Sequence, residues 1–153
     1  MENTLAVAKA LFVMHDDMFH KKIDELRMHK LMYFIQRESL IVNGDILFPE
    51  DFLGWKYGPV LSSVRAEFRD SEPFMDIKEN VKDETKALIA DVLERFKDVS
   101  SWRLSIMSHE EFSWKFSRTG LNPSDNGNVH LSIDAMKIDA LTEVSNRKKV
   151  AKD

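Results

Sequence analysis

The strongest constraint on the fold is a stretch of apolar residues spaced for an α-helix. They recur at positions i, i+3, i+4 and i+7, and two aromatic residues widen the stripe. The stripe consists of Met28, Leu31, Met32 and Ile35, with Tyr33 and Phe34 beside it. This spacing predicts a largely buried helix over residues 24–41. We expect it to end at Asn43 and Gly44, because both residue types tolerate a left-handed backbone.

Helical spacing governs most of the remaining chain as well. Stripes of the same period predict helices over residues 82–99, 60–68 and 133–144, the last with Ser132 as its N-cap. Less regular helices are expected near the amino terminus and over residues 102–116. Residues 45–59 instead carry two prolines and two glycines, which favours a β-ribbon. We therefore predict a mainly α protein, a compact single helical domain with a small β-ribbon around residues 46–57.

Length and composition agree with one such domain. The chain has 153 residues, of which 43% are hydrophobic and 31% are charged, so it can bury a core beneath a charged surface. Residues 146–153 are basic with little apolar content, so we expect a domain over residues 1–145 and a disordered tail after it. No apolar run is long enough for a bilayer, and Glu2 stands where a signal peptide would carry a basic residue, so a cytoplasmic protein is expected.

Charge and cysteine content exclude several classes of function. The chain has no cysteine, which removes disulfide scaffolds, cysteine-ligated metal sites and cysteine nucleophiles. Its formal net charge of −4 argues against binding to nucleic acids or membranes, and it favours a partner whose contact surface is basic. The local exception is a cationic cluster formed by Lys21, Lys22, Arg27, Lys30 and Arg37. This cluster leaves two alternatives open, a winged-helix-like DNA-binding regulator and docking to an acidic protein surface.

No motif for nucleophilic catalysis or nucleotide binding occurs in the sequence, since Gly-x-Ser-x-Gly and Gly-x-x-x-x-Gly-Lys are both absent. His15, Asp16 and His20 supply ligand types for a divalent metal, but their spacing is poor for one helix face, so a metal-dependent hydrolase is only a minor alternative. His109 and Glu110 are similar to the start of a zinc-protease helix, although the second histidine is missing. We therefore expect no enzymatic activity, no cofactor and no metal.

Aromatic residues carry the remaining signal. If their segment is a strand, Trp55 and Tyr57 share one side of it and Lys56 faces the other, because successive side chains of a strand alternate. Tryptophan and tyrosine are common in binding hot spots, yet they also anchor ordinary cores. Both roles stay open for these two residues and for Trp102 and Trp114.

Two elements of the sequence resemble a known family. The first consists of Lys30-Leu-Met-Tyr-Phe-Ile-Gln36, then Gly44, Leu47-Phe48 and Phe52-Leu-Gly-Trp-Lys-Tyr-Gly-Pro-Val60. The second runs from Ser108-His109-Glu110 through Trp114-Lys115 to Arg118. In order and spacing, the two elements resemble the Panacea domain, the family of SocA-like antitoxins that are also described as phage-associated proteins.

The resemblance implies a helical, non-enzymatic protein that neutralises a toxin by direct binding. The toxin would come from an adjacent gene, and in at least one branch of the family the antitoxin delivers its toxin to a Clp-type protease. The candidate partner-binding residues are Trp55, Lys56, Tyr57, Gly58, Pro59, His109 and Trp114. Alternatively, these residues only build the corner between ribbon and helix, with Gly58 supplying a backbone shape that other residues resist. In that case His109 would bond a backbone carbonyl near Trp114.

Overall fold

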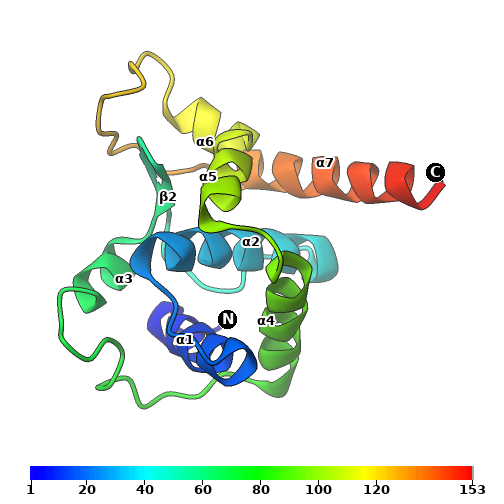
Figure 1. The fold of residues 1–153 in the computed structure, drawn as a ribbon. Coiled ribbons are helices and arrows are strands. Elements are labelled where there is room, and N and C mark those ends of the chain that lie inside the picture. The colour runs from blue at the N-terminus through cyan, green and yellow to red at the C-terminus, as the bar shows by residue number, and fades with distance from the viewer. Residues whose placement is uncertain (153) are drawn as a thin grey trace.

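The computed structural model describes residues 1–152, and in this part of the chain it contains seven α-helices and one antiparallel pair of strands (Figure 1). In chain order the elements are α1 (Thr4–Phe19), α2 (Glu25–Asn43), β1 (Leu53–Trp55), β2 (Gly58–Val60), α3 (Ser62–Glu67), α4 (Asp83–Phe96), α5 (Ser101–His109), α6 (Phe112–Ser117) and α7 (Ile133–Lys152). The predicted fold class, a compact mainly α domain with a small β-ribbon, is confirmed.

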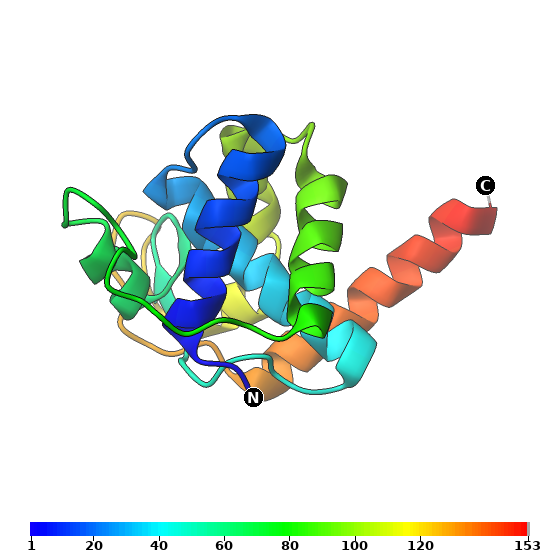
Figure 2. The same cartoon turned by 90° about the horizontal axis from the view of Figure 1, so that it is seen from below.

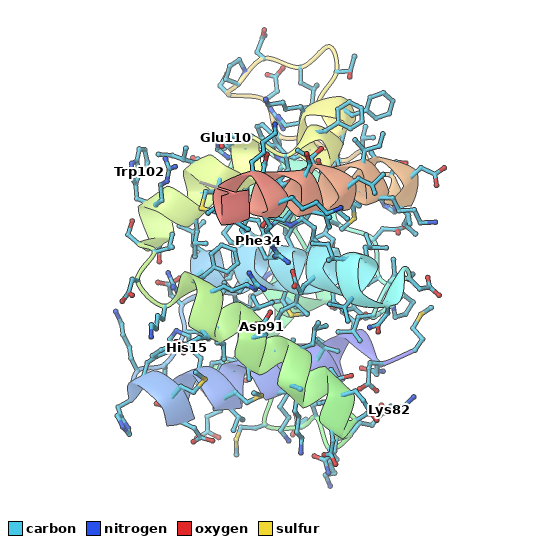
Figure 3. All side chains as sticks on the ribbon, turned by 90° about the vertical axis from the view of Figure 1, so that its right-hand side faces the viewer. His15, Phe34, Lys82, Asp91, Trp102 and Glu110 are labelled. Carbon is cyan, nitrogen blue, oxygen red and sulfur yellow. The ribbon has the colours of Figure 1, made fainter. Side chains whose placement is uncertain are left out.

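The central element is α2. It packs against α1, α4, α5, α7 and the strand β2, and in Figure 3 it lies between α7 on one side and α4 and α1 on the other. Every residue from Met28 to Leu40 is buried, on all faces of the helix. The predicted end of the helix is also confirmed, because Gly44 adopts φ 73° and its N–H donates to the Leu40 carbonyl.

Because α2 is buried on all faces, several of its polar side chains are buried as well, which an apolar stripe does not predict. These residues are His29, Lys30, Gln36, Arg37, Glu38 and Ser39. Each takes part in at least one hydrogen bond, as expected if a buried unpaired polar group costs ~1–3 kcal/mol. The Gln36 amide, for example, donates to the Phe48 carbonyl at 2.9 Å and accepts from the Leu47 N–H at 2.7 Å. These two bonds fix the segment that leads into the strands.

The strands form a tight hairpin over residues 53–60. Leu53 pairs with Val60 and Trp55 with Gly58, so Lys56 and Tyr57 form the turn. The prediction that Trp55 and Tyr57 share one side of a strand is therefore wrong, since the chain reverses direction between them. Gly58 follows the turn with φ 115°, a conformation that glycine adopts without strain and that closes many such hairpins.

The last helix, α7, projects from the body of the protein, and its carboxyl end lies beyond the other helices (Figures 1 and 2). It begins as predicted, because the Ser132 hydroxyl accepts from the Ala135 N–H at 3.3 Å. It continues through residues 146–152, where composition predicts a disordered tail, and the expected domain boundary at residue 145 falls inside it. One reason is that Arg147 donates to both carboxylate oxygens of the buried Glu38, at 3.1 and 2.7 Å.

Candidate functional site

The candidate partner-binding residues meet at one corner of the protein. The hairpin packs against α5 through β2 and against α6 through β1, and Figure 1 shows it beside both helices. The hairpin supplies Trp55, Lys56, Tyr57, Gly58 and Pro59, the end of α5 supplies His109, and α6 supplies Trp114. The fold thus brings together two sequence elements that lie about fifty residues apart. We refer to these seven residues as the hairpin corner.

Stacking and a hydrogen bond join the two halves of the hairpin corner. The rings of His109 and Trp114 stack, with centroids 4.4 Å apart and planes 14° apart, and the Trp114 indole N–H donates to the Trp55 carbonyl at 2.7 Å. Burial lowers the pKa of His109, the charge of Lys30 lowers it further, and the Tyr57 backbone raises it in part. His109 is therefore neutral at pH 7 and acts as a flat stacking surface.

Lys30 lies beneath the hairpin turn. Its side chain is 1% exposed, and its ammonium donates to the Tyr57 carbonyl. Burial lowers the pKa of Lys30 to about 8. Gly58 makes this arrangement possible, because a Cβ at this position would lie 2.1 Å from the Lys30 Nζ and 2.8 Å from the Ser108 Oγ. The requirement for glycine here therefore has two sources, the positive φ and the close approach of Lys30.

Cationic side chains lie over three of the aromatic rings. The guanidinium of Arg65 is 4.6 Å from the ring centre of Trp55, and the ammonium of Lys56 is 5.1 Å from that of Tyr57. Arg118 lies 5.4 Å from the ring centre of Trp114 and donates to the Gly54 carbonyl at 2.9 Å. Such contacts stabilise an exposed site by ~0.5–1 kcal/mol each. They also hold the flexible cationic side chains in defined positions.

Exposure separates the residues of the hairpin corner. Gly58 and Pro59 are buried, whereas Trp55, Lys56, His109 and Trp114 are half-buried, consistent with building the corner. Tyr57, at the tip of the turn, is 61% exposed and free to contact a partner. The remaining tryptophan, Trp102 at the start of α5, is 75% exposed and is not part of the core (Figure 3).

A cleft of about 460 Å³ opens beside the hairpin. Its lining comes from the hairpin and from the first turns of α2, together with Arg65 of α3 and Asn126. Neither Arg65 nor Asn126 is among the predicted site residues, because no spacing in the sequence connects α3 or the loop before α7 with the hairpin. The sequence does point to Lys30, because it is the first residue of the first family element. Its charge, however, groups it with the predicted cationic cluster.

The predicted cationic cluster does not form one surface. Lys30 and Arg37 are buried, and each is bonded to another part of the protein. Arg27 donates to two carbonyls at the end of α4, at 2.8 and 3.0 Å. Lys21 and Lys22 keep exposed side chains. The cluster therefore lacks the continuous row of cations by which a DNA-binding helix contacts phosphates.

The candidate metal ligands near the end of α1 have separate roles. The Nδ1 of the buried His15 lies 2.7 Å from the Lys21 carbonyl, and burial lowers the pKa of this histidine. His20 ends α1 in a left-handed conformation with φ 54°. Within residues 1–152, no three histidine or carboxylate side chains are grouped so that they could hold a metal ion. In the same part of the chain, no helix has the length and apolar character needed to cross a membrane.

The fold and the hairpin corner define a small helical protein with a β-hairpin docked on its central helix. The sequence model of the family described as antitoxin SocA-like, Panacea domain, matches residues 28–115, more than half of the chain. This range begins in α2 and ends in α6, so it contains the whole hairpin corner. The chain therefore belongs to the SocA-like antitoxin family with a Panacea domain, as its motifs indicate. No curated protein and no solved structure matches the chain significantly.

Proposed function

We propose that this chain is an antitoxin that neutralises a toxin protein by binding it directly, and that the hairpin corner is the contact surface. The family match over residues 28–115 carries the antitoxin role. It also favours a non-enzymatic role, in agreement with the absence of a catalytic motif from the sequence. The partner in this proposal is the product of an adjacent gene, and both proteins act in the cytoplasm.

The hairpin corner is suited to binding because its base is rigid and its tip is exposed. The Trp114 to Trp55 bond and the Lys30 to Tyr57 bond fix the hairpin backbone from two sides. A contact surface that is already ordered loses less conformational entropy on association. The exposed ring of Tyr57 is also of a residue type that often dominates the binding energy of an interface.

Delivery of the bound toxin to a Clp-type protease is the finer role that we propose on the family resemblance. Blocking and delivery have different effects on the amount of toxin in the cell. If the antitoxin only blocks, the toxin accumulates in a neutral complex. If it is an adaptor, the toxin disappears when the antitoxin is expressed and persists when the protease is removed, which a chase of tagged toxin measures.

Co-expression with each adjacent gene tests the direct binding. We expect restored growth and a complex that purifies as one species. Tyr57→Ala should weaken this complex at least tenfold without changing the melting temperature, because the Tyr57 side chain is largely outside the core. Leu141→Ala, at an exposed apolar residue of α7, is the matched control and should bind normally. If every adjacent gene product fails both to bind and to be rescued, the proposal is wrong.

A further inference from the structure

The cleft beside the hairpin reverses the charge of the protein locally. Its lining includes three cationic side chains, Lys30, Lys56 and Arg65, and one carboxylate, Glu25. The chain as a whole carries a formal net charge of −4. A cleft lined mainly by one sign of charge, with walls of low dielectric constant, concentrates the electric field that an approaching partner experiences. The charge that is favoured on a partner at this point therefore depends on the cleft and not on the net charge of the chain.

Two of these cations are held in place before any partner arrives. Arg65 lies on the ring of Trp55 and 3.4 Å from Glu25, and Lys56 lies on the ring of Tyr57. Both remain accessible, since the Arg65 side chain is exposed and that of Lys56 is half-buried. Side chains that are already positioned lose less rotamer freedom when they pair with an anion. The rim of the cleft thus presents two ordered cations.

The cleft also has apolar walls between its cations. Leu26 is exposed on the first turn of α2, and Trp55 and Tyr57 line the same cleft from the hairpin. An apolar side chain with carboxylates beside it would use both parts of this lining. A phosphate backbone would pair with the cations but would leave the apolar walls without a contact. This combination favours an acidic protein segment over a nucleic acid.

We propose that this cleft receives an acidic segment of the toxin, in which a leucine or similar side chain is flanked by aspartate or glutamate. The apolar side chain packs between Leu26 and Trp55, and the flanking carboxylates pair with Lys56 and Arg65. The ammonium of Lys30 stays bonded to the Tyr57 carbonyl and adds its charge from below. The inference rests on the proposed function, since it specifies the chemistry of the surface that the hairpin corner binds. It opposes the expectation from net charge that this partner surface is basic.

Peptide binding to the full chain tests this chemistry without the toxin. The probe is a fluorescein-labelled short peptide of alternating leucine and glutamate, and its reference is the same peptide with glutamine in place of glutamate. By fluorescence anisotropy, we expect the wild-type chain to bind the acidic peptide at least tenfold more tightly than the reference. This preference should largely vanish in about 0.5 M salt, where the Debye length falls to a few ångströms.

Two pairs of variants locate the binding. Lys56→Glu with Arg65→Glu should weaken the acidic peptide at least tenfold, whereas Lys148→Glu with Lys149→Glu, an identical charge change on exposed lysines of α7, should leave it within twofold. Lys56→Gln with Arg65→Gln avoids new repulsion against Glu25 and should also remove the preference. Thermal melts confirm that each variant is folded.

Three outcomes overturn the proposal. They are equal binding of the two peptides, equal weakening by the two charge-reversed pairs, and tighter binding of a single-stranded oligonucleotide than of the acidic peptide. The outcomes for the toxin are separate. A chain that rescues growth without preferring the acidic peptide contradicts the cleft chemistry and leaves the antitoxin role intact. A chain that prefers the acidic peptide but binds and rescues no adjacent gene product contradicts the antitoxin role.

Discussion

The two polar regions near opposite ends of α2 use their charges in different ways. Toward α7, arginines and carboxylates pair with one another inside the protein. This α7 network consists of Tyr33, Arg37, Glu38, Glu111, Asp139, Glu143 and Arg147. Toward the hairpin, Lys56 and Arg65 rest on aromatic rings at an open cleft. The first region uses its charges to hold helices together. The second has one carboxylate, Glu25 beside Arg65, and leaves its cations accessible to another molecule.

Asp139 shows how the α7 network sets geometry. Its carboxylate accepts from the Tyr33 hydroxyl at 2.7 Å, from the Phe112 N–H at 2.7 Å and from the Ser113 N–H at 3.0 Å. The two N–H groups belong to the first turn of α6, where the local N-cap residue Glu111 makes no side-chain capping bond. A residue of α7 therefore caps α6 while it bonds to α2. One carboxylate orients three helices, including the helix that carries Trp114.

The largest expected effect comes from breaking the α7 network at Asp139. Asp139→Ala leaves the Phe112 and Ser113 N–H groups without an acceptor and the Tyr33 hydroxyl with only the Ser113 Oγ as a partner, so we expect the free energy of unfolding to fall by ~4 kcal/mol. Urea denaturation measures the loss. Asp134→Ala, at an exposed aspartate of the same helix, should cost at most ~1 kcal/mol. Similar losses in both variants would show that the network does not hold the helices.

The next effect concerns the base of the hairpin corner. Gly58→Ala places a Cβ against Lys30 and Ser108 at a positive φ, so we expect a loss of ~2–3 kcal/mol in the free energy of unfolding. Gly120→Ala is the matched control, because Gly120 also has a positive φ, 83°, but no atom lies within 4 Å of its Cβ position. It should cost only the backbone strain, ~1 kcal/mol. Equal losses would mean that the close approach of Lys30 carries no weight.

The sequence predicts the architecture because most of the fold follows from apolar spacing. The stripe through Met28 and Ile35 identifies the central helix, and Gly44 marks its end. Spacing cannot reveal that this helix is buried on every face, because burial of Lys30 and Arg37 depends on partners distant in the chain. For the same reason, composition alone treats both residues as surface cations.

The hairpin corner is partly predictable for a different reason. Its residues form two local motifs, and the family resemblance joins them. The turn at Lys56 and Tyr57 was not predictable from alternation, because three-residue strands are too short to show a period. Arg65 and Asn126 reach the cleft only through tertiary packing, and neither residue type is distinctive in its local sequence. The helix α7 continues into residues 146–152, where Arg147 bonds Glu38, a residue far away in the sequence that composition cannot take into account.

The last prediction tests both regions by the dependence of the free energy of unfolding on pH. Burial lowers the pKa of Lys30 to about 8 and raises that of Glu111 to about 7. Above pH 8 the folded protein has released the Lys30 proton that the unfolded chain still binds, so this lysine makes stability rise with pH up to about 10. Between pH 4.5 and 7 the folded protein holds a Glu111 proton that the unfolded chain has released, so this carboxyl makes stability fall with pH.

Other groups also titrate in these windows. The lowered pKa of His109, for example, makes stability rise with pH where Glu111 makes it fall. Comparing each variant with the wild type isolates the contribution of the replaced residue. In the wild type, Lys30 should raise the free energy of unfolding by ~2 kcal/mol between pH 8 and 10, and this rise should be absent from Lys30→Met. Glu111 should lower the free energy of unfolding by a similar amount between pH 4.5 and 7, and this fall should be absent from Glu111→Gln. Urea denaturation at each pH gives the slopes. Glu111→Gln should leave the upper window unchanged, because the two groups belong to different regions. Lys30→Met removes a charge that lowers the pKa of His109 and His29, so it changes the lower window only through these two histidines. A change of slope in the upper window caused by Glu111→Gln would mean that the hairpin and the α7 network are electrostatically coupled, which contradicts the separation drawn between them.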